Sequence, residues 1–83
     1  MGEYVKIVEY FRVALQHLIL EEFVSAGELG VVADTSPGNI TKFLNGIKGL
    51  GLAKQERIAI YFNLTHLDMI ILGKDLCEEC LYE

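Results

Sequence analysis

Residues 25–46, SAGELGVVADTSPGNITKFLNG, predict two short helices joined by a tight turn. Ser25 and Glu28 have the spacing of a capping box, in which each side chain satisfies a free backbone N–H at the start of a helix. This helix is expected to run to Ala33. Asp34-Thr35 then makes the turn, since aspartate tolerates the left-handed backbone conformation better than most residues do.

The second helix of this stretch begins with Ser36 as N-cap and Pro37 at the first helical position, where the missing N–H of proline costs nothing. It ends at Asn45-Gly46, a common C-terminal signal. Ile40 is taken as the inward direction, and each residue turns the helix by about 100°. Three apolar residues then stay on the core side: Phe43, Leu44 and Ile47. The outer side carries one small residue, two short hydrogen-bonding side chains and one cation: Gly38, Thr41, Asn45 and Lys42.

A long helix is expected ahead of this stretch, over about residues 3–21. Apolar residues recur there at spacings of three and four and form one face: Tyr4, Ile7, Val8, Phe11, Leu15, Leu18 and Ile19. Glu9, Arg12 and Gln16 fall on the opposite side. This pattern is that of an amphipathic helix with its apolar face toward the core.

Two more helices are expected after residues 25–46. The first covers residues 53–62, and the second covers residues 65–73, opens with a second capping box and stops at Gly73. Residues 74–83 are expected as a tail, either a further short helix or a frayed end. Four residues of this tail repeat at helical spacing and either close the core or pair two chains: Leu76, Cys77, Cys80 and Leu81. The sequence therefore predicts an all-α, compact five-helix bundle, with residues 1–83 as one domain.

Charge is unevenly distributed along the 83 residues, whose formal net charge is -5. Residues 35–57 hold four basic residues and one acid, whereas acids outnumber bases by four in residues 1–34 and again in residues 58–83. A local positive segment can steer a phosphate backbone where the average charge cannot. The hydrophobic content of 52 % is high for so small a chain and favours association of copies.

Residues 25–46 resemble the helix-turn-helix of the phage-repressor and Cro (XRE) family. Leu29 and Ala33 stand where that family places a buried apolar pair, and Ile40 where it places the apolar residue of its recognition helix. The stretch at 45–48, NGIK, is similar to the segment that contacts the DNA backbone in lambda-like repressors. The resemblance covers about residues 25–73. Three positions depart from the usual glutamine, alanine and glycine of the family: Ala26, Gly30 and Asp34.

The resemblance implies a lambda-repressor-like fold and a sequence-specific DNA-binding transcriptional regulator that places its third helix in the major groove. A homodimer would read two half-sites about 34 Å apart on double-stranded DNA. The expected DNA-binding residues are Ser36, Gly38, Asn39, Thr41, Lys42, Asn45 and Lys48. The alternative is a protein-interaction module on the same fold, with weak or lost DNA binding and acidic faces that bind a basic partner.

Enzymatic activity is not expected, because neither histidine has a neighbouring nucleophile and no pair of carboxylates is set by the sequence as acid and base. No cofactor, metal site or small-molecule substrate is expected either. The lone C-x-x-C at Cys77 and Cys80 has no second motif to complete a zinc site. No apolar run reaches the length of a membrane span, and the N-terminus is not that of a secretory signal, which predicts a cytoplasmic protein.

Overall fold

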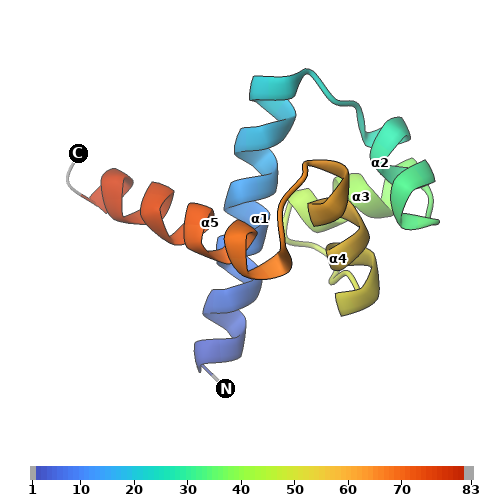
Figure 1. Cartoon of the computed structure of the whole chain (residues 1–83). Helices are drawn as coiled ribbons and strands as arrows, with labels where there is room; N and C mark the ends of the chain where they lie inside the picture. The colour runs from blue at the N-terminus through green and yellow to red at the C-terminus, as the bar shows by residue number, and fades with distance from the viewer. Residues whose placement is uncertain (1, 82–83) are drawn as a thin grey trace.

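The computed structural model describes the backbone of residues 2–81 and the side chains of residues 6–78, and within these residues every regular element is a helix (Figure 1). The helices are α1 (Gly2–Glu22), α2 (Ala26–Ala33), α3 (Pro37–Leu44), α4 (Leu52–Tyr61) and α5 (His66–Leu81). The predicted all-α architecture of five helices is confirmed for this part of the chain. The radius of gyration, 12.0 Å, is that of a compact fold of this length.

The core is shared by all five helices. Its largest fully buried side chains are Phe11 and Leu15 of α1, Leu29 of α2, Ile40 and Phe43 of α3, Ile58 of α4 and Met69 of α5. The rings of Phe11 and Phe43 lie 6.1 Å apart, a distance typical of tilted aromatic pairs. The inward positions predicted for α3 at Ile40 and Phe43 are therefore confirmed.

Short-range hydrogen bonds set the starts of α2 and α3 at the two serines that the sequence predicts as caps. Of the capping box predicted at Ser25 and Glu28, the described side chains show the serine half, while Oε1 of Glu28 lies 3.5 Å from the Ser25 hydroxyl. The hydroxyl of Ser25 accepts from the backbone N–H of Glu28 at 3.1 Å, and that of Ser36 accepts from the N–H of Asn39 at 3.1 Å. Asp34 follows α2 in the left-handed conformation, with φ 57° and ψ 53°. These contacts join residues only three apart, which is why local sequence is enough to place them.

Gly73 does not end α5, and the expectation that the helix stops there is wrong. The helix continues to Leu81, so residues 74–81 of the predicted tail are helical, while residues 82–83 lie outside the described part. Gly73 is buried where α5 crosses α1, and a Cβ atom at this position would overlap the backbone carbonyl of Tyr10. Glycine is thus required for the close approach of the two helices that Figure 1 shows crossing.

A buried polar side chain joins α4 to α5. Gln55, only 3 % exposed, donates from Nε2 to the backbone oxygen of Leu50 at 2.6 Å, and its Oε1 lies 2.8 Å from Nε2 of His66. The imidazole of His66 in turn stacks on Phe11, with ring centroids 5.3 Å apart. His66 is the first residue of α5 and acts as a packing group. Gln55 was not expected in the core, since a polar residue gives no hydrophobic signal.

No helix in the described part of the chain has both the length and the apolar character needed to cross a membrane.

Candidate nucleic-acid interface

The sequence-predicted site residues gather on α3 and on the loop that follows it. α2 and α3 are joined by residues 34–36, and α3 contacts both α2 and α1. The approach of α2 to this turn is close, because a Cβ atom at Gly30 would lie 2.8 Å from the backbone oxygen of Thr35 and 3.2 Å from the nitrogen of Pro37. Glycine at this position therefore suits the tight turn seen here.

Two side chains from α1 hold the C-terminal end of α3. Nε of Arg12 donates to the backbone oxygen of Phe43 at 2.8 Å, and Nε2 of Gln16 donates to the oxygen of Leu44 at 2.7 Å. The guanidinium of Arg12 also lies 5.3 Å from the centre of the Phe43 ring and pairs with Glu9. The last carbonyls of a helix lack partners within it, and the bond from Gln16 satisfies that of Leu44. The bond from Arg12 is a second one to the Phe43 carbonyl, which also accepts from the N–H of Gly46 at 3.1 Å. Both bonds fix α3 against α1.

Sequence reasoning missed this role of Arg12 and Gln16. The four-residue spacing places both on one face of α1, but a face opposite the apolar stripe gives no sign that it meets another helix. Arg12 is half-buried with its side chain 14 % exposed, and the partners of both residues are about thirty positions away in the sequence. No local pattern could have found them.

The face of α3 opposite the buried Ile40 and Phe43 is exposed, as predicted. Its exposed residues include all four outward positions and both flanking site residues: Gly38, Thr41, Lys42, Asn45, Ser36 and Lys48. No acidic residue lies in α3. The expectation for Ile47 is wrong, because this side chain is 74 % exposed. The helix ends at Leu44, and Gly46 with φ 75° redirects the chain, so helical stepping no longer applies at Ile47.

Asn39 differs from the other site residues in being half-buried. Its Nδ2 donates to Oγ1 of Thr35 at 2.9 Å, and its Oδ1 accepts from Nζ of Lys48 at 3.0 Å. The loop lysine is therefore held beside the N-terminal half of α3. The oxygen and the nitrogen of this amide each have a partner within the protein, and Asn39 thereby positions Lys48.

The positive segment at residues 35–57 is only partly available to a ligand. Nζ of Lys54 donates to the backbone oxygens of Ala33 at 3.2 Å and of Asp34 at 3.0 Å, which places a cation at the C-terminal end of α2. The ammonium group of Lys54 thus stabilises the turn between α2 and α3. The side chains of Lys42, Lys48 and Arg57 are exposed.

Neither a metal cluster nor a known relative accounts for this surface. Among the described side chains, no three histidine, cysteine, aspartate or glutamate residues lie together so that they could hold a metal ion, and the side chain of Cys80 falls outside that set. The chain matches no protein-family model, no curated protein and no solved structure.

Proposed function

We propose that this chain is a DNA-binding regulator of the phage-repressor type, with a lambda-repressor-like helix-turn-helix formed by α2 and α3. The observation that carries the proposal is the two-sided character of α3. One side is anchored in the core by Ile40 and Phe43, and the other is exposed, free of acids and bears Lys42. An α-helix with its side chains is about 10–12 Å across, which matches the width of the major groove.

Each exposed group of α3 has a role in this arrangement. Gly38 has no side chain and so permits close approach of the helix to the duplex, while Thr41 and Asn45 offer hydrogen-bonding groups to base edges or to phosphates. Lys42 and Lys48 neutralise phosphates. Ser36 caps the helix and orders its first turn.

The operator would be read by a homodimer with half-sites about 34 Å apart. Apolar side chains exposed on α5 support association of copies, since Leu67 is 63 % and Ile71 50 % exposed and the two lie one helical turn apart. Such a pair on one face is the kind of surface that a second copy covers.

The test is a gel shift on mixed duplex fragments at low and at moderate salt. Binding is expected to survive moderate salt on a subset of fragments, because base contacts add to the phosphate contacts only at cognate sites. Binding at low salt that vanishes uniformly on all fragments would leave only a general attraction to phosphate. Failure to bind at any salt would instead favour the second candidate, a protein-interaction module, which the exposed carboxylates of Glu22 and Glu28 support because they could meet a basic partner.

A further inference from the structure

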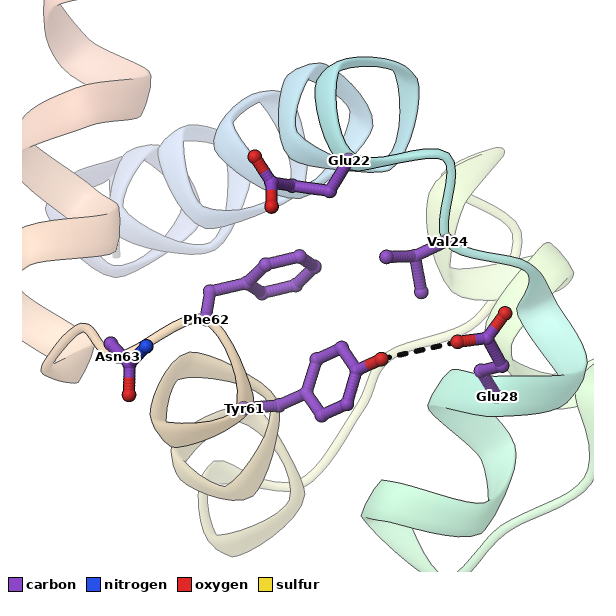
Figure 2. Close-up of a pocket in the computed structure, with 6 residues that line it drawn as sticks. All are labelled: Glu22, Val24, Glu28, Tyr61, Phe62 and Asn63. Atoms are coloured by element: carbon purple, nitrogen blue, oxygen red, sulfur yellow. Dashed lines mark hydrogen bonds between the residues drawn. The ribbon is translucent and has the colours of Figure 1, made fainter.

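A second surface of the molecule forms a pocket of about 380 Å³ where the end of α1, the start of α2 and the end of α4 meet (Figure 2). The residues that line it are Glu22, Val24, Glu28, Tyr61, Phe62 and Asn63. None of them belongs to α3 or to the loop that follows it. The pocket is therefore separate in its residues from the proposed DNA interface, and can be tested independently.

Two carboxylates stand at the edges of this pocket. Glu22 and Glu28 lie on opposite sides in Figure 2, and both are exposed. Glu28 is held in place, since its Oε2 accepts from the hydroxyl of Tyr61 at 3.1 Å and its Oε1 lies 3.5 Å from the hydroxyl of Ser25. The Glu28 carboxylate raises the pKa of Tyr61 above 10.0, mainly through this hydrogen bond. No basic residue lines the pocket, so its two negative charges have no counter-charge among the lining groups.

Aromatic rings form the wall between the carboxylates. The rings of Tyr61 and Phe62 lie 5.2 Å apart at 85°, in a T-shaped pair, and Phe62 is half-buried beside the nearly buried Val24. The face of an aromatic ring carries partial negative charge and attracts cations, and the apolar edge accommodates hydrocarbon.

The end of α4 adds a third source of negative potential. Phe62 is the C-cap of α4, and Asn63 follows with φ 61°, so the pocket lies at the C-terminal end of the helix. Carbonyl groups at that end give it a partial negative charge that favours a cation.

We propose that this pocket binds an organic cation, an alkylguanidinium or alkylammonium group, seated between Glu22 and Glu28 and against the rings of Tyr61 and Phe62. The volume is in the range of small-ligand sites. A hard metal ion is usually held by several carboxylates, and the described side chains here offer two, beside the hydroxyl of Tyr61 and the amide of Asn63. The cation is either a free small molecule or a lysine or arginine side chain of another protein, and the two sources differ in the test below.

The first measurement is a nuclear magnetic resonance titration of the intact chain with N-acetyl-arginine methylamide, and in parallel with the neutral N-acetyl-citrulline methylamide. The arginine probe is expected to shift amide signals of residues 22–28 and 61–63 with a Kd of about 1–10 mM, as a single exposed cation site should. The citrulline probe should leave them in place, because it has the same shape and no charge. Equal shifts with both probes, or shifts confined to other segments, would overturn the proposal.

Charge-neutral variants assign the binding to this pocket. Glu28→Gln keeps an oxygen that accepts from Tyr61, so the wall is preserved while a charge is lost. Combined with Glu22→Gln, it should weaken the arginine probe about tenfold. The matched control is Glu56→Gln, an exposed carboxylate of α4 outside the pocket, which should keep the parent Kd. If the double variant Glu22→Gln, Glu28→Gln binds the arginine probe as tightly as the parent, the probe does not bind in this pocket.

A peptide with one arginine among neutral residues separates the two sources of the cation. Binding at least about tenfold tighter than the capped amino acid means that neighbouring chain contributes contacts and supports a protein partner. Equal affinity of the two supports a free small cation. Both results keep the pocket as a cation site. If neither the capped arginine nor the peptide binds at concentrations up to about 50 mM, the proposal is rejected.

Discussion

Arg12 on α1 grips the last turn of α3 through Phe43, by a hydrogen bond of 2.8 Å to its backbone oxygen and a guanidinium 5.3 Å from the centre of its ring. The bond gives the Phe43 carbonyl a second donor beside the N–H of Gly46, and the ring attracts the cation. A helix proposed to enter a groove needs a fixed axis, and this pair supplies one from a residue thirty-one positions away.

Arg12→Ala should lower the free energy of unfolding by about 2 kcal/mol, because it removes a charge-assisted hydrogen bond and a half-buried packing group. Arg12→Lys should recover only part of this, since an ammonium lacks the planar fork. Urea denaturation followed by circular dichroism measures both. Glu9→Gln removes only the exposed ion pair and should cost under about 1 kcal/mol. Equal losses in Arg12→Ala and Glu9→Gln would show that the contacts with Phe43 contribute nothing.

Gly73→Ala should destabilise the fold by about 1–3 kcal/mol or more, although alanine has the better helix propensity. The added methyl group meets the backbone of Tyr10, which cannot move aside as a flexible side chain would. Gly27→Ala is the matched control, a helical glycine that is exposed and whose Cβ would lie 3.6 Å from Oγ of Ser25. That control should keep or raise the melting temperature. A Gly73→Ala protein that melts no lower than the parent would mean that α1 and α5 do not cross at this residue.

Asp68 should make stability depend on pH on the acid side. Its carboxylate accepts from the backbone N–H of Thr65 at 3.0 Å, and this bond, followed by the side-chain bond with the same residue, holds the pKa of Asp68 below 3.8. Because the folded pKa lies below the unfolded one, the stabilisation is present above about pH 3.8 and is lost as pH falls through the folded pKa. Asp68→Asn should therefore flatten the acid limb of stability against pH. Asp75→Asn, an exposed charge on the same helix, should leave it steep, and parallel curves for all three proteins would contradict the assignment.

Local sequence was enough wherever a structure depends on neighbours along the chain. Ser36 and the residue three positions on form a cap whose geometry is set within one turn, so the start of α3 could be predicted. Glycine is also a common signal for the end of a helix, and on that ground the sequence predicts a stop at Gly73. The helix continues instead, because this glycine lies against the backbone of Tyr10 in α1, a contact that sequence spacing does not show. The prediction that Ile47 faces the core was wrong for a related reason, because it extended the helical periodicity beyond Leu44, where α3 ends. The outward face of α3 was predictable, while the hydrogen bonds that support it were not.

Lys42 and Lys48 should carry much of the salt-dependent DNA affinity, because Lys42 lies on the exposed face of α3 and Lys48 is held beside that helix by Asn39. Each neutralised phosphate contributes about 0.9 to the slope of log affinity against log salt. The double variant Lys42→Ala, Lys48→Ala should flatten the slope by about two units and weaken all duplexes alike. A lysine that reads guanine would instead lose about 1–3 kcal/mol at cognate sites only.

The matched control for this pair removes the same charge elsewhere, with Lys6→Ala and Lys74→Ala on α1 and α5, both exposed in the parent. Filter binding over a salt series compares the two double variants after their melting temperatures are shown to equal that of the parent. If α3 is the reading helix, the Lys6 and Lys74 variant keeps its slope, because those side chains lie on helices outside the proposed interface. Equal flattening of the salt slope in the two double variants would mean that DNA affinity follows net charge, and the proposal that α3 enters the major groove would be rejected.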